Sequence, residues 1–188
     1  ADLYAAGGPA YPLSSPGVRL RAQPTGGVTL LAGVFDDNPP GGPFADDPQV
    51  RGAEAMGTKF NLNTGALWIG EIQYAVNSPS LGAMAYANQS PGLPGTYKLG
   101  AWFDSGAFPD RRFDTLGLSL ASPASNGIAR MRQGNYSVYA VADQMVWRPD
   151  PNGTQSIGAF VRVMGAPADR NLISFGANAG MVLKAPFP

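Results

Sequence analysis

Hydrophobic residues alternate with small or polar ones along 173–184, and this is the clearest pattern in the chain. Side chains of a β-strand point to opposite faces with a period of two. One face would therefore carry Ile173, Phe175, Ala177, Ala179, Met181 and Leu183. The other would carry Ser174, Gly176, Asn178, Gly180, Val182 and Lys184. Such a strand separates an apolar phase from water, and the pattern alone leaves open whether that phase is a protein core or a bilayer.

The same period predicts about eight strands and no helix. The predicted strands are 18–23, 27–35, 54–62, 66–76, 96–104, 135–147, 155–165 and 173–185. Most span nine residues or more, whereas strands of water-soluble proteins peak near 5–6 residues and a tilted membrane-spanning strand needs about 9–11. The alternation becomes unclear after Gln144, where we expect a bulge. We therefore predict an all-β, antiparallel fold with long strands.

The predicted connections fall into two groups by length. Pro24-Thr25-Gly26 and Asn63-Thr64-Gly65 have the composition of tight hairpin turns. The segments 36–53, 77–95 and 105–134 are longer, polar and rich in glycine and proline. Transmembrane barrels have short turns at one rim and long loops at the other. We expect 105–134, the longest of these segments, to be a loop on the outer side.

Composition narrows the classes of function. The chain of 188 residues has 13 basic and 13 acidic residues, so its charge gives no reason to expect nucleic acid as a partner. Charged residues make up only 14% of the chain, compared with about 25% in typical soluble domains. The sequence contains no cysteine and no histidine, which excludes Ser-His-Asp and Cys-His catalysis and a thiolate metal site. We expect neither an enzyme nor a bound metal or cofactor.

Several segments, in order along the chain, resemble one known family. They are 7–12 (GGPAYP), 34–39 (VFDDNP), 65–74 (GALWIGEIQY), 95–106 (GTYKLGAWFDSG), 113–115 (FDT) and 134–145 (GNYSVYAVADQM). Together they resemble the carbohydrate-selective porin (OprB) family of Gram-negative outer membranes. The resemblance runs through nearly all of 1–188, which would form a single, partial barrel domain from the middle and later part of a porin.

The resemblance implies an antiparallel transmembrane β-barrel of about 16 strands through which small sugars diffuse passively. Its implied surroundings are outer-membrane lipid and small sugars, without nucleic acid. About eight strands do not close such a barrel, and an unpaired edge is untenable in lipid. The chain would therefore need the remainder of the barrel or further copies of itself.

A sugar pore needs hydrogen-bonding groups and flat rings on the face that lines the lumen. The polar sides of the predicted strands supply Lys59, Glu71, Gln73, Lys98, Trp102, Asp104, Asp143, Arg162 and Lys184. Charges of both signs at this density suit a neutral, hydroxylated solute better than an ion. We predict that these nine residues line the pore.

Other interpretations of the same residues stay open at this point. A soluble β-sandwich that binds carbohydrate would show the same alternation, with its apolar faces buried between two sheets. A glycoside hydrolase would need a carboxylate pair, for example Glu71 with Asp143, about 5–9.5 Å apart. A cluster at Asp36, Asp37, Asn38, Asp46 and Asp47 carries oxygen ligands of the kind Ca²⁺ prefers, but its spacing is not that of an EF-hand. We expect that cluster to be a solvated loop.

Overall fold

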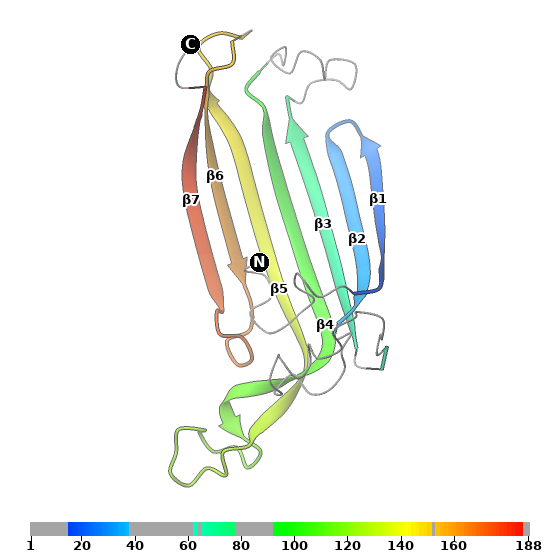
Figure 1. Ribbon diagram of the computed structural model, residues 1–188, viewed down its shortest axis with the longest axis vertical. Helices are drawn as coiled ribbons and strands as arrows, with labels where there is room; N and C mark the ends of the chain where they lie inside the picture. The colour runs from blue at the N-terminus through cyan, green and yellow to red at the C-terminus, as the bar shows by residue number, and fades with distance from the viewer. Residues whose placement is uncertain (1–14, 38–61, 64, 78–91, 152, 186–188) are drawn as a thin grey trace.

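The computed structural model describes residues 15–37, 62–63, 65–77, 92–151 and 153–185. These residues form one antiparallel sheet of seven strands, in which each strand pairs with the next along the chain (Figure 1). The strands are β1 (Gly17–Thr25), β2 (Val28–Asp36), β3 (Ala66–Val76), β4 (Gly95–Asp114), β5 (Ala129–Trp147), β6 (Ser156–Gly165) and β7 (Phe175–Lys184). The sheet is not closed, because β1 and β7 lie at its opposite edges. Within the described residues, no helix is long and apolar enough to cross a membrane.

Seven of the predicted strands are confirmed, with shifts at their ends. The prediction for 54–62 and the turn at 63–65 include residues outside the described part of the chain. The first turn is Gly26-Gly27, not Pro24-Thr25-Gly26, because Thr25 already pairs with Val28. The bulge expected after Gln144 is confirmed by a register shift between Met145 and Trp147.

The apolar face of the sheet is the exposed one, whereas a soluble protein buries its apolar face. Along β4, residues 97, 99, 101 and 103 are exposed and alternate with residues that are less exposed. The exposed face is the apolar one: Leu99 is 61% exposed, and its neighbours across the sheet, Ile72 and Val163, are also exposed. Met181 on the edge strand β7 is 71% exposed. We call this apolar side the outer face and the opposite side the inner face.

The outer face excludes the β-sandwich interpretation for the described residues. A sandwich buries the apolar sides of two sheets against each other. Here the described strands all belong to one sheet, and no second sheet among them covers the outer face. Ile173, the first residue of the opening pattern, precedes β7 and lies outside the strand.

The segment 105–134 is not the single long loop that the sequence predicts. β4 continues to Asp114 and β5 begins at Ala129, so the two strands extend beyond the others and bend away at the lower end of the sheet (Figure 1). Two irregularities hid this extension from the sequence pattern. The register shifts between Asp104 and Ala107, and Gly134 on the opposite strand has φ +76°. A bulge adds a residue to one strand, which interrupts the period of two and bends the ladder.

Salt bridges and hydrogen bonds hold the extended hairpin to the β6–β7 connection. The buried carboxylate of Asp110 accepts hydrogen bonds from Arg130 (3.1 Å) and Arg132 (2.9 Å). Arg132 also lies 3.5 Å from Asp169, whose backbone carbonyl accepts a hydrogen bond from the Arg111 N–H. Burial raises the pKa of Asp110, but the hydrogen bonds from the Arg112 N–H and the two arginines outweigh it and hold the pKa well below its usual range. The carboxylate therefore stays ionised.

Burial at the junction of β2 and β3 also corrects the prediction of a solvated acidic loop. Asp36 and Asp37 are 6% and 1% exposed, so this part of the predicted solvated loop is buried. Asp37 lies beside Gly65, where a Cβ would come within 2.5 Å of its Oδ2 atom. The other members of the acidic cluster, Asn38, Asp46 and Asp47, are outside the described residues.

Candidate functional site

The strand register places eight of the nine predicted lining residues on the inner face. Gln73 pairs with Lys98, Lys98 with Val141, and Val141 with Arg162, so these residues form one row across four strands. By the same register and the period of two, the inner face also carries Glu71, Trp102, Asp104, Asp143 and Lys184. Lys59 lies outside the described residues. The shared face is an observation, and the lining role of these residues remains a prediction.

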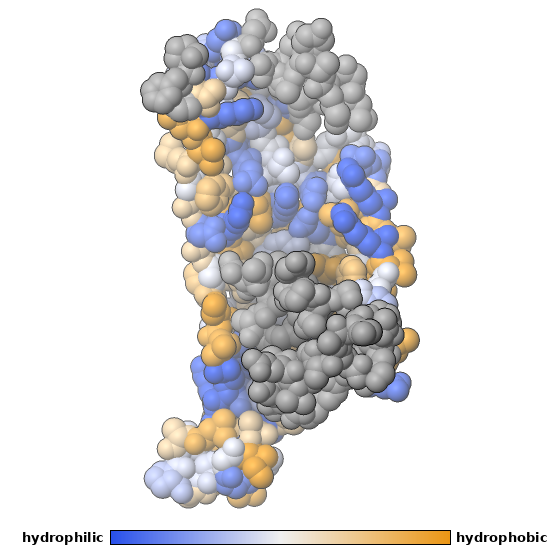
Figure 2. Space-filling view, viewed as in Figure 1, coloured by the Kyte–Doolittle hydropathy of each residue, from blue (hydrophilic) through white to orange (hydrophobic). Residues whose placement is uncertain are grey.

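Part of this set surrounds a hollow in the middle of the inner face. Figure 2 shows hydrophilic residues in a band across the sheet, with hydrophobic residues along its sides. The hollow measures about 460 Å³. Its charged and polar lining is Glu71, Lys98, Tyr139, Asp143, Arg162 and Asn178. Four of the predicted residues thus meet around one space, with two cationic and two anionic side chains.

Glu71 is fixed in place by two side-chain hydrogen bonds. Its Oε2 atom accepts a hydrogen bond from the Tyr139 hydroxyl at 2.5 Å, and its Oε1 atom accepts one from Gln73 at 2.5 Å. The tyrosine comes from β5 and the glutamate from β3, so the bond crosses β4. Both carboxylate oxygens are fixed by neutral donors, which leaves the negative charge uncompensated by these partners and available to hydroxyl donors.

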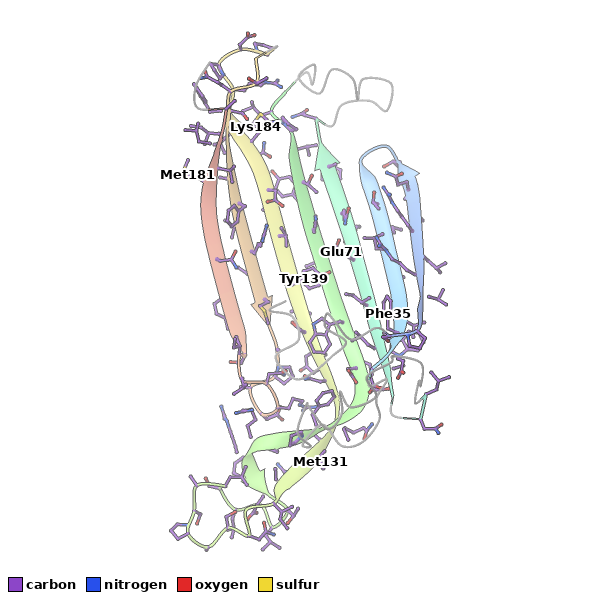
Figure 3. All side chains as sticks on the ribbon, viewed as in Figure 1. Phe35, Glu71, Met131, Tyr139, Met181 and Lys184 are labelled. Atoms are coloured by element: carbon purple, nitrogen blue, oxygen red, sulfur yellow. The ribbon has the colours of Figure 1, made fainter. Side chains whose placement is uncertain are left out.

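The remaining predicted residues are not brought to this hollow. Trp102 and Asp104 are only 6% and 3% exposed and lie nearer the bulge, so the structure buries them where the sequence predicts contact with solute. Lys184 ends β7 at the opposite end of the sheet (Figure 3).

The sequence prediction missed Tyr139, Arg19 and Arg21. Arg19 pairs with Gly33 and Arg21 with Leu31, which places both arginines on the inner face. A signal for them existed, because Arg19 and Arg21 alternate with Val18, Leu20 and Ala22. Tyr139 has the parity of Asp143, which places it on the polar side of 135–147, but it was not included among the predicted lining residues.

The outer face carries two cross-strand groups of aromatic residues. Trp68 pairs with Phe103, and Phe103 pairs with Tyr136. Six residues away along β3, Tyr74 pairs with Tyr97. Six residues of strand span roughly 20 Å. Barrels of outer membranes have an apolar band about 25 Å tall between two aromatic girdles, and these two groups have that arrangement.

Neither a metal centre nor a hydrolytic carboxylate pair is built from the described residues. Among them, no group of three or more acidic side chains could hold a metal ion. Glu71 pairs through Gly100 with Tyr139, and Asp143 lies four residues further along β5. With about 4.8 Å between strands and 3.4 Å per residue, the Cα atoms of the two acids are roughly 17 Å apart. That separation does not favour the 5–9.5 Å spacing of glycosidase carboxyls.

An antiparallel meander with an exposed apolar face, aromatic groups at both ends of that face and a polar inner face defines the wall of a membrane β-barrel. The comparisons with known proteins agree with this class. The model of the carbohydrate-selective porin, OprB family, matches residues 2–188, and the chain belongs to that family.

One solved structure shows the same fold. The chain is similar to OprB of Pseudomonas putida, in a structure described as its high-pH form, with a TM-score of 0.70 and 20% sequence identity. The match covers 94% of this chain but only 37% of the Pseudomonas chain. The comparison with curated proteins gave no match.

Proposed function

We propose that these 188 residues form part of the wall of an outer-membrane pore through which small sugars diffuse passively. One observation carries the proposal: the seven strands expose their apolar side chains and turn their charged side chains to the opposite face. In water such a face would be a large aggregation-prone patch, whereas in a bilayer it is the expected surface. Family membership supports sugars as the solutes and the outer membrane of a Gram-negative bacterium as the location.

The inner face supports passage of neutral, hydroxylated solutes without catalysis. Donors such as Lys98 and Arg162 alternate with acceptors such as Glu71 and Asp143, as a sugar with many hydroxyl groups requires. β1 and β7 each have a neighbour on only one side within the described sheet. We propose that residues 1–188 are one partial barrel domain, whose edges pair with the remainder of the barrel or with further copies of the chain. Lipid then covers the outer face.

Liposome swelling tests this function directly. The full-length protein, reconstituted into liposomes, should make them swell in isosmotic glucose, at a rate that increases with the amount of protein and without an ion gradient. Protein-free liposomes are the control. Absence of swelling in glucose, together with stable monodisperse behaviour without detergent, would contradict the proposal.

A further inference from the structure

The extended hairpin, residues 105–134, exposes charge of one sign. All of this segment is described, and its charged residues are Asp110, Arg111, Arg112, Asp114, Arg130 and Arg132. Both acids are buried, whereas Arg111 and Arg112 are exposed and the other two arginines reach the surface in part. The surface of the hairpin is therefore cationic, although its acids are nearly as numerous as its bases.

Arg111 and Arg112 carry charge that the hairpin does not neutralise. The register of β4 with β5 shifts at this point, so both arginines lie in a bulge outside the regular ladder. The backbone of the bulge is fixed, because Asp110 Oδ1 accepts hydrogen bonds from the N–H groups of Arg112 (2.8 Å) and Phe113 (3.1 Å). The Asp110 carboxylate forms its ion pairs with the two arginines of β5. Among the described residues, neither guanidinium of the bulge has an ion-pair partner.

Apolar side chains lie beside these arginines on the surface of the hairpin. Leu116, Leu118 and Ile128 are exposed at its tip, and Met131 is exposed on β5 (Figure 3). The tip is held in shape by Asp114, whose Oδ1 atom accepts hydrogen bonds from the N–H groups of Leu116 and Leu118. Because the tip is already ordered, binding through these side chains would cost little conformational entropy.

The hairpin leaves the sheet at the level where the membrane surface is expected. Phe103 and Tyr136, which belong to one aromatic group of the outer face, immediately precede the bulge at residues 104–107. Aromatic girdles of outer-membrane barrels lie at the boundary between lipid and water. Beyond this level the hairpin bends away from the line of the other strands (Figure 1). Lipid headgroups are therefore the nearest surface that continues the lipid contact of the outer face.

We propose that the extended hairpin docks on the headgroup layer of the membrane, where Arg111 and Arg112 bind phosphates of anionic lipids and the apolar tip enters the layer. A guanidinium can donate two parallel hydrogen bonds to one phosphate. Basic side chains next to exposed apolar ones are typical of elements that lie in the membrane interface. The inference rests on the proposed function only because the barrel must stand in a membrane.

A fluorescent probe at the tip tests the docking in the full-length protein. Leu116→Cys provides the attachment point for a polarity-sensitive fluorophore, and residues 1–188 contain no other cysteine. The protein is reconstituted into phosphatidylcholine vesicles with increasing proportions of phosphatidylglycerol. The emission should shift to the blue as the anionic lipid increases, and a lipid spin-labelled at its headgroup should quench it. High salt should reverse both changes, because it screens exposed charges.

Replacing the two arginines should weaken the docking in steps. Arg111→Gln or Arg112→Gln should lower the docking equilibrium constant about fivefold, and the double variant about 25-fold. Arg148→Gln is the matched control, because it removes the same charge from the β5–β6 connection at the opposite end of the sheet, and its docking should equal that of wild type. Hydrogen exchange of 105–134 in detergent reports whether each variant keeps the folded hairpin.

The possible results separate this inference from the broader function. A probe that responds equally in both lipids, or a double glutamine variant that docks like wild type, would overturn the docking, while glucose swelling would still support the porin. A blue shift that follows the protein density in the vesicle and not the anionic lipid would also overturn it, because a second copy would then cover the tip. Docking without any glucose swelling would support this inference and contradict the proposed function.

Discussion

The strands β4 and β5 pass through two regions built on opposite principles. Between the two aromatic groups they expose apolar residues such as Leu99 and Val138 and turn polar ones inward. Beyond the bulge, in the extended hairpin, the carboxylates of Asp110 and Asp114 are buried and fully hydrogen-bonded. The first arrangement suits lipid and the second suits water. The same two strands can therefore face lipid on one side of the bulge and water on the other.

The extended hairpin is organised from within by Asp114. Its carboxylate accepts hydrogen bonds from the backbone N–H groups of Leu116 and Leu118 and from the Ser125 hydroxyl. Burial raises the pKa of Asp114, but these hydrogen bonds, with the one from Ser125 the largest, lower it overall. For Asp169, the hydrogen bond from Arg170 is the main cause of a lowered pKa. The hairpin thus depends on ionised carboxylates.

The largest effect should come from placing a charge on the outer face. Ala177→Arg lies on the outer face in register with Val163, between the levels of the two aromatic groups. At mid-bilayer depth an arginine costs about 2–4 kcal/mol, so assembly should fall strongly. The measurement is the folded fraction on heat-modifiable gels after refolding into lipid. Asn178→Arg, the next residue on the opposite face, is the matched control and should assemble. Equal assembly of both variants would mean that the outer face does not meet lipid.

Removing the buried carboxylate of the hairpin should have a smaller and local effect. Asp110→Asn removes the ionic partner of Arg130 and Arg132, whose side chains are 42% and 34% exposed. Hydrogen bonds to charged groups are worth about 1.5–3 kcal/mol. We expect faster hydrogen exchange and proteolysis in 105–134, with unchanged exchange in the sheet between the aromatic groups. Arg111→Gln, exposed on the same strand, should leave the hairpin intact. Exchange that rises equally throughout the sheet would contradict the separation of the two regions.

Acid should open the hairpin by protonating its buried carboxylates. Asp110, Asp114 and Asp169 have folded pKa values below the ordinary 3.8, so their contribution to stability is complete above about pH 5. It is lost as the pH falls through 3.8 towards the lower folded values. Hydrogen exchange at about pH 7, 5 and 3 should show opening of 105–134 only at the lowest pH. In Asp110→Asn this acid response should be reduced. A hairpin that opens between pH 7 and 5 would contradict the role of these carboxylates.

The smallest effect should come from the charges of the inner face. Lys98→Ala and Arg162→Ala should assemble normally and change the ratio of sugar flux to salt flux by less than about fivefold. The reason is that exposed charges contribute under about 1 kcal/mol. Liposome swelling and reversal potentials measure the two fluxes. The matched outer-face comparison is Ala177→Arg, which should change assembly. Unchanged selectivity in both alanine variants would argue against a lining role.

Much of the fold was predictable because a strand has a period of two. The alternation in β3, β4, β6 and β7 identified the strands and the residues that share a face, including Glu71, Lys98 and Arg162. The prediction failed where the backbone leaves that period. The bulge near Ser105 and the positive φ of Gly134 broke the pattern, and 105–114 and 129–134 were therefore interpreted as loop.

The sequence by itself determined that the protein would be a sheet with one apolar and one polar face, because that property is local to each strand. Only the tertiary structure decided which residues of the polar face meet. Register between distant strands brings Tyr139 to Glu71, 68 residues away, and Asp110 to Arg132. The same register places the Tyr139 ring over Gly100, so a side chain at position 100 would collide with that ring. The direction of the apolar face was likewise set by the structure, because alternation defines two sides but not which one is covered.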